Sequence, residues 1–358
     1  MKKFILSSTV LLTSLFLLAG RGIVDTIACL RKDSVKVFNW GEYMDPEIIK
    51  DFEKEYDVCV KLVTFDSNES AITKMKTESF DVIVPSDYAI EQMVSEDLLE
   101  VLDWNRITNL NRTTDLADGL STILSNVSFN VLDYGVPYFW GNVGILYNKD
   151  KVSVAELEQK QWNIFKENYD IAFYDSARDG FMVALKQLGY SMNTSDTSEL
   201  TAAENWLQDI ASKDNVVFLT EEILDGMPEL KYDIALVYSG DAIYLMSEQE
   251  KLGFYVPTVG TNVWVDAMVI PKNAKNKDLA YDFINFVSSY DQALLNTEYV
   301  YYSTPRKDTY LDMIKPDGEF YTYIDAYEVI VNDNDEVFKY LPEVKSFTSD
   351  ALARIRIS

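Results

Sequence analysis

Three short segments of the chain place an aromatic ring near a carboxylic acid at the end of an expected strand. These segments are Trp40-Gly41-Glu42-Tyr43, Ser86-Asp87-Tyr88 and Trp264-Val265-Asp266, and Tyr302 adds another ring before a polar turn. An alkyl-ammonium ligand needs apolar walls for its methylene groups and a carboxylate for each ammonium, since a buried unpaired charge is very costly. Aromatic faces also attract an ammonium, by about 0.5–2 kcal/mol each. The pattern indicates a site for an organic cation, with ordinary core packing as the competing interpretation of any single ring.

The elements that must hold these segments alternate between strand and helix. In the first part of the chain, strands are expected over 35–39, 60–64 and 80–84, and helices from Pro46, from Ser67 or Asn68 to Met75, and over 89–99. Further on, strands are expected over 171–174, 234–238 and 264–270, and helices after Asp179 and over 277–288. This alternation predicts an α/β fold with a mixed, mostly parallel sheet flanked by helices. Such sheets bind ligands at the carboxyl ends of their strands, where the aromatic and acidic segments fall.

The charge of the chain restricts its partners. The 358 residues include 32 Lys and Arg against 58 Asp and Glu, which gives a formal net charge of −26. Such a surface repels phosphate backbones and anionic lipid, so no nucleic acid partner is expected, whereas a cationic ligand is attracted. Acidic residues also keep a surface soluble, so the charge alone does not define a site. The length favours two lobes.

Few features of the sequence suit catalysis or metal binding. Histidine, the commonest general base and transition-metal ligand, does not occur. The sequence also has no nucleophile elbow, Walker loop, dinucleotide-binding glycine motif or zincin motif. We therefore expect no enzyme, no cofactor and no metal. Two alternatives stay open: a ferric-iron carrier that uses Tyr301 and Tyr302, and a carbohydrate-active hydrolase that uses paired carboxylates.

The first 33 residues are interpreted as a separate targeting segment. Two lysines precede a mostly apolar run over 4–20, which is typical of an export signal, and an uncleaved membrane anchor is the alternative. Residues 17–20 are similar to the end of a bacterial lipoprotein signal, but Arg21 stands where that signal needs cysteine. The two cysteines, Cys29 and Cys59, are compatible with a disulfide or with two free thiols.

Eight motifs resemble, in the same order, those of the spermidine/putrescine-binding proteins of ABC transporters. The motifs are FNWGEY at 38–43, FDSNE at 65–69, DVIVPSDY at 81–88, VPYFWG at 136–141, LGYS at 188–191, WVDAMVIP at 264–271, AKNK at 274–277 and YSTP at 302–305. The resemblance spans residues 35–340. It implies a two-lobed periplasmic-binding fold that closes over its ligand by a hinge motion.

The resemblance also implies how the chain is divided and what it does. Residues 34–138 and 266–308 form lobe 1 in this interpretation, residues 139–265 and 309–358 form lobe 2, and the ligand cleft lies between them. The implied role is the extracytoplasmic substrate-binding component of an ABC transporter. Such a protein captures spermidine or putrescine, works as a monomer and passes its ligand to membrane permease subunits.

The resemblance and the residue pattern together give a set of expected ligand-binding residues. They are Trp40, Glu42, Tyr43, Ser86, Asp87, Tyr88, Asp179, Tyr238, Trp264, Asp266 and Tyr302. Asp266 falls on the amine-binding carboxylate of the family, and Asp179 falls on a second acid. Ser176 stands where some members that prefer spermidine carry an acid, so which polyamine is preferred stays open.

Overall fold

The structure, a computed structural model, describes residues 32–125 and 129–356. Residues 1–31, which include the apolar run of the expected export signal and Cys29, lie outside these residues. Cys59, the first residue of β2 (Cys59–Phe65), is disulfide-bonded. In the part of the chain that the structure describes, no helix is both long and apolar enough to cross a membrane.

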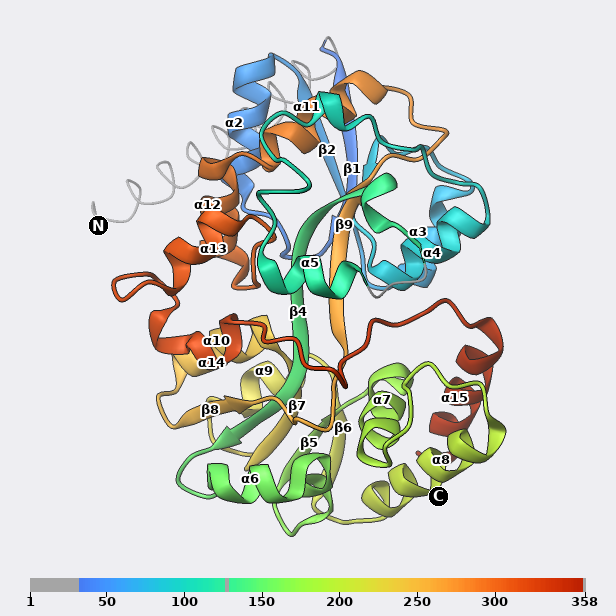
Figure 1. Cartoon of the computed structure of the whole chain (residues 1–358), viewed down its shortest axis with the longest axis vertical. Coiled ribbons are helices and arrows are strands. Elements are labelled where there is room, and N and C mark those ends of the chain that lie inside the picture. Colours follow the sequence, from blue (N-terminus) through green and yellow to red (C-terminus); the bar gives the residue numbers. More distant parts are fainter. Residues whose placement is uncertain (1–31, 126–128, 357–358) are drawn as a thin grey trace, which may run out of the picture.

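The upper half of the molecule in Figure 1 is built on three parallel strands. β1 (Ser34–Trp40) lies between β2 and β3 (Val82–Ile83), and the helices that follow these strands are α2 (Pro46–Tyr56), α3 (Asn68–Met75) and α4 (Asp87–Ser95). Side-chain caps fix where two helices begin, because Asp45 accepts a hydrogen bond from the backbone of α2 and Ser67 from that of α3. The strand and helix expectations for this region are confirmed.

The strand β3 is shorter than expected, and the helix after it begins and ends earlier than expected. The strand expected over 80–84 keeps two residues, and the helix expected over 89–99 begins at Asp87 and ends at Ser95. The Asp81 carboxylate accepts a hydrogen bond from Lys36 N, which a longer ladder would pair with a backbone carbonyl. At the other end Pro85 has no N–H to continue the ladder. The earlier helix start places Asp87 in a buried first turn.

Two buried strands link the upper half to the lower half. β4 (Gly135–Asn148) pairs antiparallel with β9 (Val263–Val269), and all residues of both strands are buried. β9 continues to β3 through the pair Ile83 and Val269, and β4 continues to β7 (Ile234–Tyr238). The resulting strand order is β2-β1-β3-β9-β4-β7-β5-β6, with β8 beside β4.

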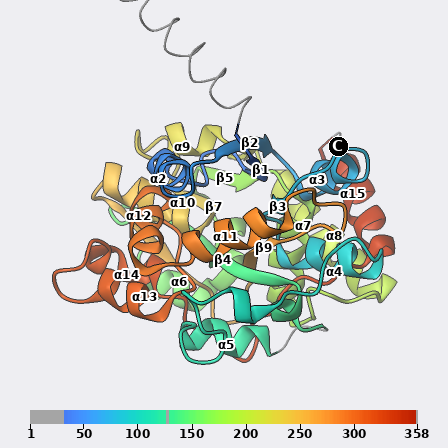
Figure 2. The same cartoon turned by 90° about the horizontal axis from the view of Figure 1, so that it is seen from above.

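The lower half repeats the parallel arrangement. β5 (Ile171–Tyr174) lies between β6 (Val216–Leu219) and β7, and β8 (Leu252–Tyr255) pairs antiparallel with β4. Its helices are α6 (Val154–Lys160), α7 (Ala177–Gln187), α8 (Thr197–Ala211), α9 (Glu222–Gly226), α10 (Ser239–Glu248) and α15 (Pro342–Ile355). Helices flank the sheet on both sides (Figure 2). The α/β fold class with a mixed sheet is confirmed.

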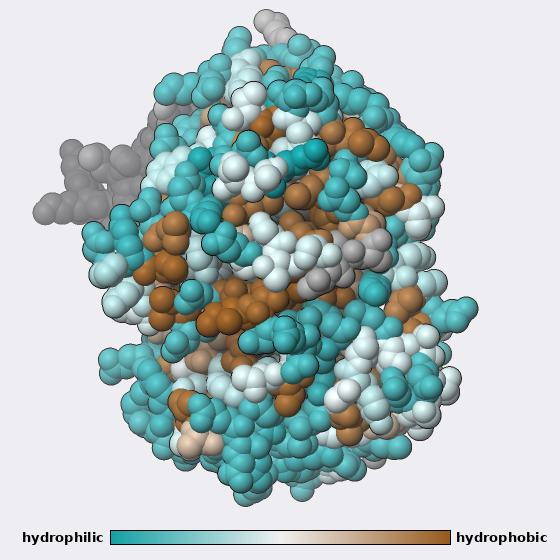
Figure 3. Space-filling model, in the orientation of Figure 1, coloured by the Kyte–Doolittle hydropathy of each residue, from teal (hydrophilic) through white to brown (hydrophobic). Residues whose placement is uncertain are grey.

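The remaining helices close the chain around this sheet. They are α5 (Asp118–Leu124), α11 (Lys277–Val287), α12 (Tyr290–Val300), α13 (Lys307–Ile314) and α14 (Ile324–Tyr327). The lobe boundaries expected from the sequence fall within β4, within β9 and in the first turn of α13, and the assignment of residues to lobes stays a prediction. On the face shown in Figure 3, apolar residues gather along the waist where the two halves meet.

The first testable prediction concerns Asp81, which is 4% exposed. Its carboxylate accepts hydrogen bonds of 2.8 Å each from the backbone N–H groups of Lys36, Lys275 and Asn276. Asp81→Ala leaves these donors without their acceptor, at about 1–3 kcal/mol per buried group. We expect the free energy of unfolding, measured in urea, to fall by about 3 kcal/mol or more.

The control for this prediction is Asp97→Asn. Asp97 pairs with Lys272 on the surface, where its side chain is 88% exposed. An exposed pair contributes about 0–1 kcal/mol, so its loss should change stability little. Equal losses in the two variants would show that Asp81 does not hold β1 to the loop before α11.

Candidate ligand-binding site

Five aromatic side chains form a continuous row at the waist of the molecule. Edge-to-face contacts join Tyr43, Tyr302, Trp264, Tyr238 and Tyr174 in that order, with ring centroids 5.9, 5.0, 6.1 and 5.5 Å apart. The rings come from the turn after β1, the segment after α12, and strands β9, β7 and β5. Strand ends from both halves therefore build one apolar wall, the aromatic row.

Glycine allows two of these rings to approach the backbone closely. A Cβ atom at Gly240, in the first turn of α10, would lie 2.4 Å from the Tyr302 ring. A Cβ atom at Gly141 of β4 would lie 2.7 Å from Trp264. Any larger residue at either position would displace a ring of the row.

A buried carboxylate lies beside the Tyr43 end of the row. Asp266 is 5% exposed, and its Oδ2 accepts a hydrogen bond of 2.9 Å from the Tyr43 hydroxyl. Its other oxygen, Oδ1, accepts no hydrogen bond from the described residues. Burial raises the pKa of Asp266 to about 6, although the neighbouring Ser86 and Tyr43 hydroxyls act to lower it. The Asp266 carboxyl is therefore held in place but retains a free acceptor.

A second carboxylate repeats this arrangement further along the row. Asp179, in the first turn of α7, is 3% exposed, and its Oδ2 accepts a hydrogen bond of 2.9 Å from the Tyr238 hydroxyl. Within residues 32–125 and 129–356, its Oδ1 has no hydrogen-bond donor. Burial raises the pKa of Asp179, against the lowering effect of Ser176 and Arg178. Two half-satisfied acids thus accompany the row, one from each half of the molecule.

Two other expected acids have partners of their own. Asp87 is 2% exposed, and its two oxygens accept hydrogen bonds from Val265 N at 2.9 Å and Tyr88 N at 2.6 Å. Burial raises its pKa to about 7. Asp87 therefore braces α4 against β9. Glu42 is exposed and accepts a hydrogen bond of 3.0 Å from the Tyr299 hydroxyl. Ligand contacts by these two acids stay predictions.

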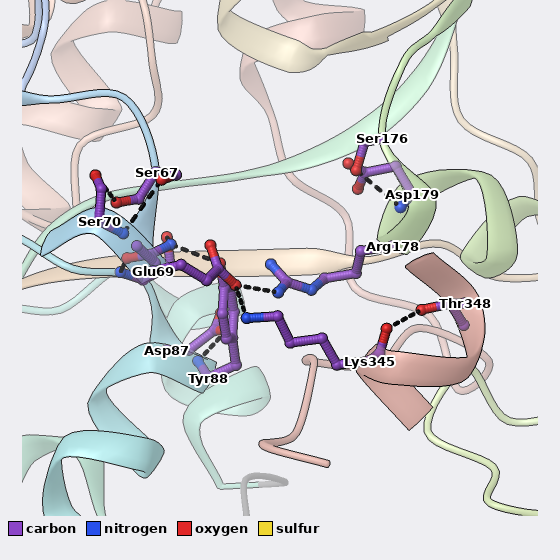
Figure 4. A network of polar contacts seen from close by, with 12 residues as sticks. Ser67, Glu69, Ser70, Asp87, Tyr88, Ser176, Arg178, Asp179, Lys345 and Thr348 are labelled. Atoms are coloured by element: carbon purple, nitrogen blue, oxygen red, sulfur yellow. Dashed lines mark hydrogen bonds and ion pairs between the residues drawn. The ribbon is translucent and has the colours of Figure 1, made fainter. Parts of the chain in front are cut away.

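The remaining expected residues lie beside the row. The Trp40 ring is partly buried and packs against Phe65, with centroids 4.5 Å apart. The Arg178 guanidinium lies 3.5 Å from the centroid of the Tyr88 ring. Both side chains are labelled in Figure 4. The side-chain amide of Asn68 donates to Tyr88 Oη at 2.8 Å and to Ser86 Oγ at 3.0 Å.

Three residues of this region were not among the sequence-based expectations. Tyr174 completes the row, Asn68 orients Ser86 and Tyr88, and Asp241 is a buried acid whose pKa burial raises to about 6 while Tyr302 lowers it. Tyr174 ends β5 and Asp241 follows β7, so both lie at strand ends, which is the signal that could have found them. Asn68 likewise follows the end of β2 and belongs to the FDSNE motif at 65–69.

Comparison with known proteins places this fold and site in a family. The model of the bacterial extracellular solute-binding proteins matches residues 47–322, and the chain belongs to that family. Members are transport components, so the chain is not an enzyme, and the expected extracytoplasmic location is confirmed.

Within this family, the chain is similar to several proteins that are named for polyamine binding. The chain is 32% identical to the spermidine/putrescine-binding periplasmic protein of Salmonella typhimurium, over 76% of the chain and 78% of that protein. It is 30% identical to a putrescine-binding periplasmic protein of Pseudomonas aeruginosa, over 70% and 72% respectively. A solved structure of a putative spermidine/putrescine ABC transporter protein from Listeria monocytogenes has a TM-score of 0.77 and 32% identity, covering 91% of this chain and 99% of that one. The resemblance inferred from the motifs is confirmed.

The second prediction concerns the stability of the ligand-free protein and follows from the burial of Asp266. Its pKa is raised on folding, so the stability associated with the neutral carboxyl is present at low pH and is lost as pH rises through about 6. Asp266→Asn keeps a neutral group at every pH. We expect it to raise the free energy of unfolding by about 2–3 kcal/mol near pH 8 and by about 1 kcal/mol near pH 4.5.

Thermal or urea unfolding of the ligand-free proteins at both pH values measures this difference. Asp278→Asn serves as the control, because Asp278 is 91% exposed and faces Arg106 on the surface. It should give no such gain. If Asp266→Asn destabilises the protein near pH 8, Asp266 is a structural residue whose charge is already compensated.

Proposed function

We propose that the chain is the substrate-binding component of a polyamine ABC transporter and captures spermidine or putrescine between its two halves. The observation that carries the proposal is the pair of buried acids, Asp266 and Asp179. Each is held by a tyrosine hydroxyl on one oxygen and keeps the other oxygen free beside the aromatic row. The spermidine/putrescine-binding and putrescine-binding relatives support the same ligand class.

Each part of the site matches one part of a polyamine. An ammonium at Asp266 Oδ1 supplies both the missing hydrogen bond and the opposite charge, which a buried carboxylate needs. The methylene groups lie along the aromatic row, and the ring faces add attraction for the ammonium. Binding selects the ionised carboxylate, so affinity should weaken as pH falls below about 6, the raised pKa of Asp266.

Delivery requires that the closed cleft open again at the membrane. The two halves are linked by β4 and β9, and hinge closure about such links is the motion by which binding proteins enclose ligands. The proposed partners are the ligand and the permease subunits of the transporter, with the binding protein acting as a monomer.

The structure gives less support to the two alternatives. A ferric-iron site needs hard oxygen ligands close together, but Tyr301 packs against Phe320, with ring centroids 5.7 Å apart, and Tyr302 belongs to the aromatic row. The paired carboxylates of a glycoside hydrolase flank the bond that is broken, one as general acid and the other as nucleophile or as the base that activates a water. Here Asp266 and Asp179 are accompanied by contacting aromatic rings.

The third prediction tests the assignment of Asp266 as an ammonium partner. Removing one member of a buried charge pair costs about 3–5 kcal/mol, so Asp266→Ala should weaken polyamine binding by about two orders of magnitude or more. Calorimetric titration with spermidine, putrescine, spermine and Fe³⁺ measures this. Quenching or enhancement of tryptophan fluorescence reports the contact with Trp264 and Trp40. Near-normal polyamine affinity in a folded Asp266→Ala protein would refute the assignment, and binding of Fe³⁺ alone would refute the ligand class.

The fourth prediction concerns Ser176, which caps α7 by accepting a hydrogen bond of 3.3 Å from Asp179 N. A hydroxyl accepts a hydrogen bond from an ammonium but supplies no opposing charge. Ser176→Asp adds a third acid for a triamine and retains a good helix cap. We expect the ratio of putrescine Kd to spermidine Kd to rise about tenfold, in line with one added charge-assisted hydrogen bond.

Ser176→Asn is the matched control, since asparagine also caps helices and adds no charge. Competition between the two amines for each variant gives the ratio. If Ser176→Asp leaves the ratio unchanged or favours putrescine, the third amine is held elsewhere.

A further inference from the structure

A cluster of three charged side chains connects the two halves at one side of the waist (Figure 4). The Glu69 carboxylate, on α3 of the upper half, pairs with the Arg178 guanidinium at 3.2 Å and the Lys345 ammonium at 2.9 Å. Arg178 is on α7 and Lys345 on α15, both in the lower half. This cluster, the clasp, consists of one acid held by two bases from two different helices.

The clasp lies directly beside the proposed ligand site. Arg178 covers the Tyr88 ring, and its guanidinium lies 5.5 Å from the Phe338 ring centroid. Glu69 follows Asn68, whose amide bonds to Ser86 and Tyr88. A movement of Glu69 away from Arg178 therefore also uncovers Tyr88.

All three side chains of the clasp are between about a third and a half exposed. Burial acts to raise the pKa of Glu69, but Lys345 and Arg178 outweigh it and lower that pKa below its ordinary value. The acid is therefore ionised at neutral pH and carries a full charge toward both bases.

The segment before α15 is fixed to the lower half and reaches across to the upper half. Glu336 pairs with the buried Lys186, and its Oε2 also accepts a hydrogen bond of 2.8 Å from Met192 N. Further along this segment, Tyr340 N donates to Glu91 of α4 at 2.6 Å. α15 is thus anchored below, so separation of the halves has to break the contacts of Lys345 and Tyr340.

A cavity of about 310 Å³ adjoins the clasp and is lined from both halves. Glu69 and Tyr88 line it from the upper half, and Arg178, Phe338 and Lys345 line it from the lower half. The halves are therefore not held here by continuous core packing, and the charged contacts carry more of the adhesion on this side.

We propose that the clasp is a latch: its ion pairs hold the two halves closed and set the rate at which ligand dissociates. Glu69 is the central residue of the latch, because both bases pair with it. The proposal rests on the proposed function, in that a ligand is enclosed between the halves. Partly exposed ion pairs contribute about 0.2–1 kcal/mol each. Such a latch slows release by a modest factor and still lets the cleft open at the transporter.

Glu69→Gln removes the charge but keeps the size of the side chain. For putrescine and spermidine, stopped-flow measurements at low salt should give a dissociation rate about three- to tenfold higher than wild type, which corresponds to the loss of two such pairs. The association rate should change less than twofold. Added NaCl screens partly exposed pairs, so it should raise the wild-type dissociation rate toward that of Glu69→Gln.

Glu204→Gln is the matched control. Glu204 of α8 pairs with Arg354 of α15 at 2.7 Å, so this pair also involves α15 but joins two elements of one half. It should leave both rates unchanged. Lys345→Gln, whose side chain is 48% exposed, is a second variant that preserves Arg178 and should show part of the effect.

The proposal is overturned if ligand dissociates from Glu69→Gln at the same rate as from Glu204→Gln. It is also overturned if Glu69→Gln lowers the association rate and leaves the dissociation rate unchanged. If the wild-type protein binds neither amine, the proposed function fails, and small-angle scattering of the ligand-free proteins then decides the latch by itself. Glu69→Gln should show a larger radius of gyration than wild type at low salt. An equal radius in that case overturns the latch.

Discussion

Burial of the Asp266 carboxyl with only one of its oxygens satisfied is the constraint on which the site depends. Water would solvate the free oxygen at no cost, but Asp266 is buried and its Oδ1 is shielded from solvent. The protein tolerates the free-energy cost of this unpaired oxygen because backbone hydrogen bonds between β4 and β9 fix the strand that carries Asp266. The hydrogen bond from Tyr43 also prevents the carboxyl from turning toward another donor. A cation with N–H groups removes this cost, because it supplies both a hydrogen bond and the opposite charge. Specificity for a cationic ligand therefore arises from the carboxylate oxygen that the folded protein leaves unpaired.

The position of that carboxyl depends in turn on β9. Ser86 forms an isolated bridge with Asp266, Ala267 N donates to Pro85 O at 3.1 Å, and Asp87 accepts from Val265 N. The segment from Pro85 to Asp87 therefore holds β9 on both sides of Asp266. Asp87, itself one of the expected ligand-binding acids, supports the position of Asp266 through its hydrogen bond with β9.

The sequence predicts where the strands end, but it does not predict which side chains contact one another in the fold. Trp264 and Tyr43 could be placed near the site because period-2 and buried-strand patterns locate β1 and β9, and polar turns follow. The partners of Asp87 and Glu42 could not be predicted, since they depend on the start of α4 and on the approach of Tyr299 from α12, far away along the chain. The cover of Tyr88 by Arg178 likewise depends on how close α4 and α7 come together. Local patterns determine elements, whereas these contacts follow from the packing of distant elements.

The pairing of β3 with β9 has a consequence for how the molecule forms. Ile83 and Val269 are neighbours in the sheet, although β4, β5, β6, β7 and β8 all lie between them in the chain. The upper half therefore cannot complete its sheet during synthesis until residue 269 has been made. Such non-local pairing raises contact order and slows folding, because a long loop has to be closed before its contacts are gained.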